Sequence, residues 1–213
     1  MKAIVQNSCG GAASCTVKDL PTPEPGPGEV LVRVRAASLH ADIWHVLTGR
    51  PYVLRLMGAG VVHPKNPVPG TDLAGRVQAV GSGVTGFAPG DDVFGECVRG
   101  IQWKNGGALA EFATPQAKDL LPMPERLTYE QAAAAPTSGL IALQTVRDEG
   151  RVKAGQSVLV NGAGGAVGTF AVQLAAAYGG RVTAVDSQFD TPSPPTASTC
   201  TSAMTSTANA GTE

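Results

Sequence analysis

A group of glycines between a predicted strand and a predicted helix has the spacing of a phosphate-binding turn. The segment "VLVNGAGGAVGTFAV" places Gly162, Gly164, Gly165 and Gly168 at this junction. A glycine directly after a strand permits a tight turn, and the next one lets backbone N–H groups approach a pyrophosphate without an intervening Cβ. Gly168, one turn into the helix, allows that helix to lie close to the strands. Because a helix N-terminus also presents unpaired donors and partial positive charge, the pattern predicts a dinucleotide site.

An acidic residue follows the next predicted strand. Asp186 lies 24 residues beyond Gly162, close to the roughly 20 expected for a carboxylate that accepts hydrogen bonds from the adenosine ribose. A carboxylate there would repel a 2′-phosphate, which favours NAD over NADP, whereas Ser187 beside it is compatible with either cofactor. The alternative is a glycine-rich turn that binds no ligand. The strand before the turn, the helix after it and Asp186 favour the dinucleotide.

The cysteines and histidines are too scattered to form a predicted metal centre or disulfide framework. The chain has four cysteines and three histidines, and no two cysteines form a C-x-x-C pair. Zinc sites and disulfide-rich domains both need denser spacing than this. We therefore predict free thiols and no bound metal.

The first 125 residues have the pattern of short strands separated by turns. In "EVLVRVRAA", Val30, Val32 and Val34 alternate with more polar neighbours, which is the two-residue period of a half-buried strand. The segments "DLAGRVQAVGSGV", "GDDVFGE" and "GGALAEFA" repeat this pattern between turn signals. The sequence predicts a compact β domain, barrel-like or sandwich-like.

From residue 126 the pattern changes to alternating helices and strands. Thr128 and Gln131 have the spacing of a capping box that opens a helix, and Pro136 interrupts that helix. A second helical pattern is closed by Gly150. A short apolar strand, the glycine turn, an amphipathic helix and a further strand follow. The region 126–190 therefore contains one predicted β-α-β unit.

The last 23 residues, 191–213, differ in composition from everything before them. Eighteen of them are Thr, Ser, Pro or Ala, and only Glu213 is charged. Such a segment has too little apolar surface to offset the entropy of ordering it, so it is predicted to be disordered. Because the pattern is lost inside an element rather than at a domain boundary, we interpret the chain as a truncated form. A shift of reading frame or a false gene end would produce this pattern, and our hypothesis is an insertion or deletion near codon 191.

Composition excludes several classes of partner. The 213 residues carry a net charge of −1 and no run of basic residues, so nucleic acid is not a predicted partner. No apolar stretch is long enough for a signal peptide or a membrane span, so no membrane association is predicted and the expected location is cytoplasmic.

Several motifs occur in an order that is typical of one enzyme superfamily. These are "VPGTDLAGRVQAVGSGVTGFAPGDDVFG", then "AAAAPTSGLIALQ", then "AGQSVLVNGAGGAVGTFAVQLAAAYG". Over residues 1–190 the chain resembles the medium-chain dehydrogenase/reductase superfamily, and within it the zinc-independent quinone oxidoreductase-like branch. The resemblance implies an α/β protein with a GroES-like catalytic domain at 1–125, an incomplete Rossmann domain at 126–190 and the tail at 191–213. It also implies NAD(P)H-dependent hydride transfer to a quinone, an enone or a similar carbonyl compound.

The resemblance also assigns residues to the cofactor and argues against zinc. Zinc-binding relatives place a cysteine three residues before Asp42 and a histidine in a Gly-His-Glu motif. Leu39 and Thr71 stand at those places, and neither can supply a zinc ligand. The family usually has glycine where Ala166 stands, so its methyl group narrows the approach to the phosphates. The implied residues for NADP or NAD are Thr137, Gly162, Gly165, Ala166, Val167, Gly168, Asp186 and Ser187.

Without zinc, hydrogen-bond donors must stabilise a developing oxyanion. The segment "SLHADIW" borders the nicotinamide and substrate in relatives, usually with asparagine at the place of His40. We predict His40 and Asp42 as catalytic, His40 donating to a substrate oxygen and Asp42 fixing the loop; a structural histidine is the alternative. Trp44 and Tyr52 would line a flat apolar substrate pocket, or pack in the core. Thr137 would meet the nicotinamide half of the cofactor, or cap a helix.

The activity of the chain itself is a separate question. In the family, further strands and helices complete the Rossmann domain, and relatives often form homodimers through it. We therefore expect weak or no cofactor binding and an inactive chain. The alternative is a non-enzymatic nucleotide-binding or interaction protein.

Overall fold

A computed structural model of the protein describes residues 1–53, 64, 66–98 and 106–186. Contacts divide the chain into two compact units, Met1–Thr137 and Ser138–Glu213. The first unit continues beyond residue 125, where the sequence placed the domain boundary, because the next helix packs on its sheet. Ser187 and the segment 191–213 lie outside the described residues. Among the described helices, none is both long and apolar enough to span a bilayer.

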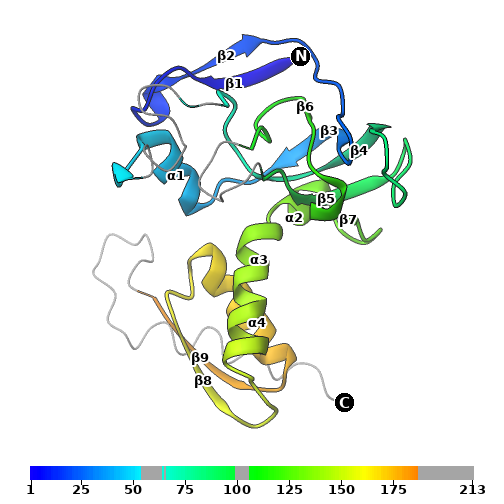
Figure 1. Ribbon diagram of the computed structural model, residues 1–213. Helices are drawn as coiled ribbons and strands as arrows, with labels where there is room; N and C mark the ends of the chain where they lie inside the picture. Colours follow the sequence, from blue (N-terminus) through cyan, green and yellow to red (C-terminus); the bar gives the residue numbers. More distant parts are fainter. Residues whose placement is uncertain (54–63, 65, 99–105, 187–213) are drawn as a thin grey trace. The chain divides into compact units, whose positions relative to one another are not determined.

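The first unit is built around antiparallel strands (Figure 1). One sheet has the strand order β6-β3-β4-β5-β7, and β1 and β2 form a separate hairpin. The elements of this unit are β1 (Lys2–Gln6), η1 (Ala12–Ser14), β2 (Cys15–Asp19), β3 (Val30–Ala37), α1 (Ala41–Thr48), β4 (Asp72–Val80), β5 (Asp92–Glu96), β6 (Phe112–Ala113), η3 (Ala117–Asp119), β7 (Leu120–Pro122) and α2 (Tyr129–Ala133).

The alternation predicted for the central strand is confirmed. Val30 and Val32 of β3 are fully buried and pack with Leu73, Val77 and Val93 from β4 and β5. The intervening arginines of β3 face solvent, because side chains alternate between the two faces of a strand. The largest core cluster of the first unit therefore lies on one face of β3, β4 and β5, and a smaller cluster on the other face packs Ala74 against Ala132 and Ala133 of α2.

The predicted helix start at Thr128 is also confirmed. The Thr128 side chain accepts a hydrogen bond from the Gln131 backbone N–H, and the Gln131 side chain accepts one from the Thr128 N–H. This reciprocal pair satisfies two donors that an α-helix leaves unpaired. Pro136 ends the run and begins α3 (Pro136–Leu143), a position where the missing N–H of proline costs nothing.

The second unit contains the predicted β-α-β arrangement. Strands β8 (Ser157–Asn161) and β9 (Arg181–Val185) are parallel, and α4 (Ala166–Ala177) connects them. Between α3 and β8 the chain forms a π-helix, η4 (Gln144–Glu149), which ends at Gly150 as predicted. Ala171 and Ala175 of α4 are buried against Ala142 and Val146. These small side chains let the helices pack closely.

Leu73 and Leu121 differ in burial, so replacing each with alanine should change the free energy of unfolding by different amounts. Leu73→Ala should lower the free energy of unfolding by about 2–5 kcal/mol, because it leaves a cavity at a fully buried site. Leu121→Ala, at an exposed position of β7, should change it by no more than about 0.5 kcal/mol. Urea unfolding of both variants measures the difference. Equal losses would contradict the placement of the core.

Candidate functional site

The glycine turn is hydrogen-bonded to the end of the neighbouring strand. Gly162 has a φ of 77°, a left-handed conformation that favours glycine, directly after β8. The backbone N–H groups of Gly162 and Ala163 both donate to the Val185 carbonyl oxygen, at 2.8 and 3.1 Å. The tight turn predicted from the sequence is therefore present, and it lies beside the C-terminal end of β9.

Gly168 brings α4 close to that turn. A Cβ at position 168 would collide with the Gly162 carbonyl oxygen and would lie 2.8 Å from the Ala163 Cα. Gly165 is the N-cap of α4 and provides no side-chain cap. The N–H donors of the first turn, which begins at Ala166 and Val167, are thus suited to a phosphate group.

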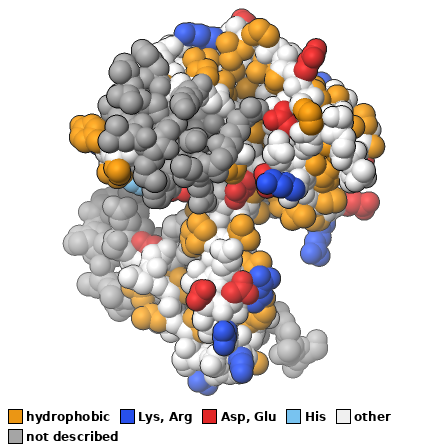
Figure 2. All heavy atoms as spheres, viewed as in Figure 1, with side chains coloured by type: hydrophobic (Ala, Val, Ile, Leu, Met, Phe, Trp, Pro, Cys, Tyr) orange, Lys and Arg blue, Asp and Glu red, His pale blue; other side chains and the backbone are white. Residues whose placement is uncertain are grey.

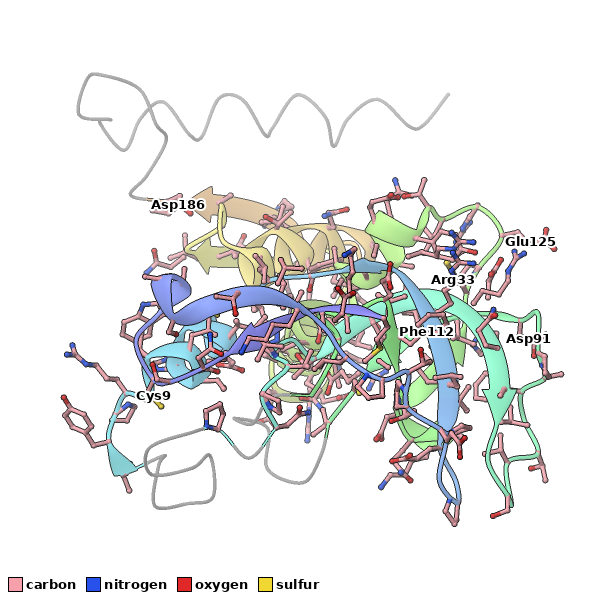
Figure 3. The ribbon with its side chains drawn as sticks, turned by 90° about the horizontal axis from the view of Figure 1, so that it is seen from above. Cys9, Arg33, Asp91, Phe112, Glu125 and Asp186 are labelled. Carbon is pink, nitrogen blue, oxygen red and sulfur yellow. The ribbon has the colours of Figure 1, made fainter. Side chains whose placement is uncertain are left out.

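Asp186 completes this end of the second unit. It follows directly after β9 and is labelled at the tip of that strand in Figure 3. Its Oδ2 atom accepts a hydrogen bond from the Gly164 backbone N–H at 2.5 Å. The structure therefore brings Asp186 to the glycine turn, as the dinucleotide pattern requires. Ser187, the adjacent predicted residue, lies outside the described residues.

A second polar cluster, which we call the Asp72 cluster, lies in the first unit. It consists of His40, Thr71, Asp72, Glu96 and Thr137. His40 is the N-cap of α1, and its Nε2 atom lies 2.7 Å from the Thr71 Oγ1 atom. The Thr71 hydroxyl donates to Asp72 Oδ1 at 3.1 Å. This chain of contacts connects a predicted catalytic residue to a buried carboxylate.

Asp72 is the centre of the cluster. Its side chain is 1% exposed and accepts from the Thr137 hydroxyl at 2.6 Å and from the Thr137 N–H at 3.0 Å. The Ser38 hydroxyl group donates to Asp72 Oδ2 at 3.4 Å. A buried carboxylate needs such donors to replace its lost hydration. Thr137, in the first turn of α3, is held by this contact and is not the cap residue of a helix.

Glu96 lies opposite Asp72 because β4 and β5 are paired in that register. Its Oε1 atom is 3.3 Å from the Thr137 hydroxyl oxygen. Burial, and then the negative charge of Asp72, raise the pKa of the Glu96 carboxyl group above its ordinary value. The Glu96 carboxyl group therefore holds a proton more tightly than an ordinary glutamate does.

The position of α1, and with it His40, is fixed from the opposite end of the helix. Gln6 of β1 is buried, and its side-chain amide donates to the carbonyl oxygens of Val46 and Leu47. Gly49 adopts a left-handed conformation and ends the helix. The long-range contact of Gln6 thus satisfies carbonyl groups that the end of α1 leaves unpaired.

The other predicted residues of the first unit are less involved in the Asp72 cluster. Asp42 Oδ2 lies 3.9 Å from His40 Nδ1, too far for a hydrogen bond. Trp44 and Tyr52 are 55% and 63% exposed, so core packing does not account for these rings. Hydrophobic side chains also reach the surface on the face drawn in Figure 2. Whether the two rings line a substrate pocket stays a prediction.

The structure bears on the metal question only within the described residues. In that part of the chain, no group of three or more His, Cys, Asp or Glu side chains is arranged to hold a metal ion. Leu39, at the place of the zinc-ligating cysteine in relatives, is exposed, and Thr71 is occupied by its contacts to His40 and Asp72.

Sequence reasoning missed Asp72 and Glu96. Both are far along the chain from His40 and Thr137, and only the pairing of strands brings them together. One signal was present in "PGTDLAG": an aspartate opens a strand and is followed directly by the apolar residues Leu73 and Ala74. Aspartate is depleted in strands, so its presence there indicates a specific partner.

Comparisons with known proteins agree with both units. Residues 26–125 match the family "Alcohol dehydrogenase GroES-like domain". The chloroplast envelope quinone oxidoreductase homolog of Arabidopsis thaliana is 36% identical over 192 residues, which are 86% of this chain and 55% of that protein. The quinone oxidoreductase of Coxiella burnetii has a similar structure, with a TM-score of 0.76 and 31% identity over 89% of this chain and 57% of that one.

A third comparison is with a solved NAD-dependent alcohol dehydrogenase. It superimposes with a TM-score of 0.72 and 36% identity, covering 88% of this chain and 58% of that one. The chain therefore spans about half the length of the relatives that it matches.

The pKa of Glu96 leads to a prediction about stability. Because that pKa is raised in the folded state, the folded protein holds this proton more tightly than the unfolded chain, and stability falls as pH rises above the ordinary glutamate range. Glu96→Gln should therefore raise the Tm at neutral pH by a few degrees. Thermal unfolding at several pH values measures this, and the gain should vanish in acid. A Tm that falls at neutral pH would contradict the assignment.

The close approach at Gly168 predicts a difference between two glycine substitutions. Gly168→Ala should displace α4 from the turn and destabilise the second unit by about 1–3 kcal/mol, because its Cβ meets backbone atoms. Gly165→Ala is the matched control, since its Cβ comes no closer than 3.3 Å to the Gly162 oxygen. Hydrogen exchange of the β8 amides compares the two. Equal protection in both variants would contradict this packing.

Proposed function

We propose that this chain is an NAD(P)H-dependent oxidoreductase by lineage. The premise is that it carries an alcohol dehydrogenase GroES-like domain and is related to the quinone oxidoreductases of the medium-chain dehydrogenase/reductase superfamily. The reaction is hydride transfer to a quinone, an enone or another carbonyl compound. The proposal divides the chain into a catalytic domain at 1–125 and part of a dinucleotide-binding domain at 126–190.

The observation that carries this proposal is the turn after β8. Its left-handed Gly162, its close approach at Gly168 and its contact with Asp186 reproduce the features of a pyrophosphate-binding turn. The geometry of this turn supports dinucleotide binding independently of the similarity to known proteins. When bound, the nicotinamide would supply the hydride.

The protein's own residues would bind and orient the reactants. The turn and the start of α4 would hold the diphosphate, with Ala166 and Val167 at the first helical positions. Thr137 would contact the nicotinamide half, as the resemblance implies, and its N–H and hydroxyl group are held in place by Asp72. His40 and Asp42 would border the substrate, and the exposed rings of Trp44 and Tyr52 would contact an apolar ring of the substrate.

We propose NAD as the preferred cofactor. The Asp186 carboxylate is held beside the turn by the Gly164 N–H, where it would accept hydrogen bonds from ribose hydroxyl groups and repel a 2′-phosphate. We also propose that catalysis needs no zinc, because Leu39 and Thr71 provide no zinc ligand. Assembly into a homodimer is a further proposal that rests on the resemblance alone.

We expect the polypeptide of 213 residues to bind cofactor weakly. In the part of the chain that the structure describes, the sheet of the second unit consists of β8 and β9, and Leu159 of β8 is exposed. The binding crevice of an open parallel sheet forms where the strand order reverses, and two adjacent strands do not create such a point.

Fluorescence titration tests the cofactor proposal. The dissociation constant for NADH should be on the order of 1 mM and lower than that for NADPH, and Asp186→Ala should remove this preference. Asp148→Ala is the control, since Asp148 is exposed and paired with Arg147. A preference for NADPH would contradict the role of Asp186. Micromolar binding with turnover of a quinone or enone would contradict the expected weakness.

A further inference from the structure

We propose that Asp72 is a positioning residue: acting through Thr71, it fixes His40 as the Nε2–H tautomer and so makes Nδ1 the accepting atom of the imidazole ring. The tautomer follows from the contacts of the first unit alone. The meaning of that tautomer for a ligand rests on the proposed function.

The Asp72 carboxylate, when ionised, can only accept hydrogen bonds. The Thr137 N–H is an obligatory donor, and it points to Asp72 Oδ2 at 3.0 Å. The Thr137 hydroxyl donates to Oδ1 at 2.6 Å, a length typical of a charge-assisted bond. These contacts identify Asp72 as the anionic end of the cluster.

The direction of the next hydrogen bond follows from proton count. Thr71 Oγ1 lies 3.1 Å from Asp72 Oδ1 and 2.7 Å from His40 Nε2. A hydroxyl group has one proton, and only a proton between Thr71 and Asp72 avoids the contact of two buried lone pairs. The Thr71 oxygen must then accept from its other neighbour, so the proton of neutral His40 is on Nε2.

Burial makes this arrangement persistent. The side chain of His40 is 7% exposed, and that of Asp72 is 1% exposed. Thr71 is also buried. Water therefore has little access to replace either hydrogen bond, and the alternative tautomer would leave a buried acceptor pair without a proton.

The tautomer changes the role expected of His40. With Nε2–H donated to Thr71, neutral His40 offers Nδ1 as an acceptor and has no proton to donate to a substrate oxygen. The Asp42 carboxylate lies near Nδ1 of His40, with its Oδ2 atom 3.9 Å away. Within the proposed function, His40 would accept a hydrogen bond from a hydroxyl or amide group of a ligand. The donor for a developing oxyanion must then be a different group.

NMR of the full chain with ¹⁵N-labelled histidine tests the proposal directly. Long-range ¹H–¹⁵N spectra at mildly alkaline pH distinguish the two tautomers of neutral histidine, and single His→Gln variants assign the signals. His45 is an internal reference, because its Nδ1 lies 2.8 Å from the Arg50 carbonyl oxygen, which can only accept. We expect Nε2–H for His40 and Nδ1–H for His45.

Two substitutions at Thr71 separate positioning from simple packing. Thr71→Val keeps the shape but removes the oxygen, so Nε2–H would face a methyl group and the Nε2–H to Nδ1–H ratio should fall about tenfold. Thr71→Ser keeps the hydroxyl group and should retain the original tautomer. Asp72→Asn should shift the ratio in the same direction as Thr71→Val. His45 should be unchanged in all three variants, which also reports that α1 is folded.

Two results would overturn the proposal. One is an Nδ1–H signal for His40 in the unaltered protein. The other is an unchanged His40 tautomer in Thr71→Val while the His45 signal shows an intact α1. None of these spectra requires cofactor, substrate or turnover. The tautomer is therefore tested separately from the proposed function: a preference for NADPH in the titration would contradict the proposed cofactor and leave the positioning role of Asp72 intact.

Discussion

A single buried anion organises the polar part of the first unit. The Asp72 carboxylate has lost nearly all contact with water, so its charge is stable only while Thr71, Ser38 and Thr137 supply donors. Each donor comes from a different stretch of the chain. The hydrogen-bonding requirement of one carboxylate therefore fixes the loop before α1, the start of β4 and the start of α3 relative to one another.

The pairing of β4 with β5 also affects the protonation of Glu96. Two carboxyl groups opposite each other in paired strands do not both ionise with ease. The pKa of the Glu96 carboxyl group is raised by its burial and then by the negative charge of Asp72. The register of β4 and β5 thus places both carboxyl groups beside the Thr137 hydroxyl group.

Local patterns in the sequence were sufficient for some parts of the structure. The capping box at Thr128 and the turn at Gly162 depend on residues within a few positions of each other, so spacing alone reveals them. The Asp72 cluster depends on strand pairing and on the N-terminus of α3, and no local period encodes these contacts. For the same reason the sequence indicated His40 as a donor, whereas its neighbours argue for the opposite role.

The bond between Gly164 and Asp186 has a consequence for the kinetics of recognition. Together with the two bonds to Val185, it ties the glycine turn to the strand end through the protein's own groups. A preordered turn loses little conformational entropy when a ligand binds. Binding should therefore need little rearrangement of the turn. Differences in affinity at such a turn are governed mainly by the rate at which the ligand dissociates.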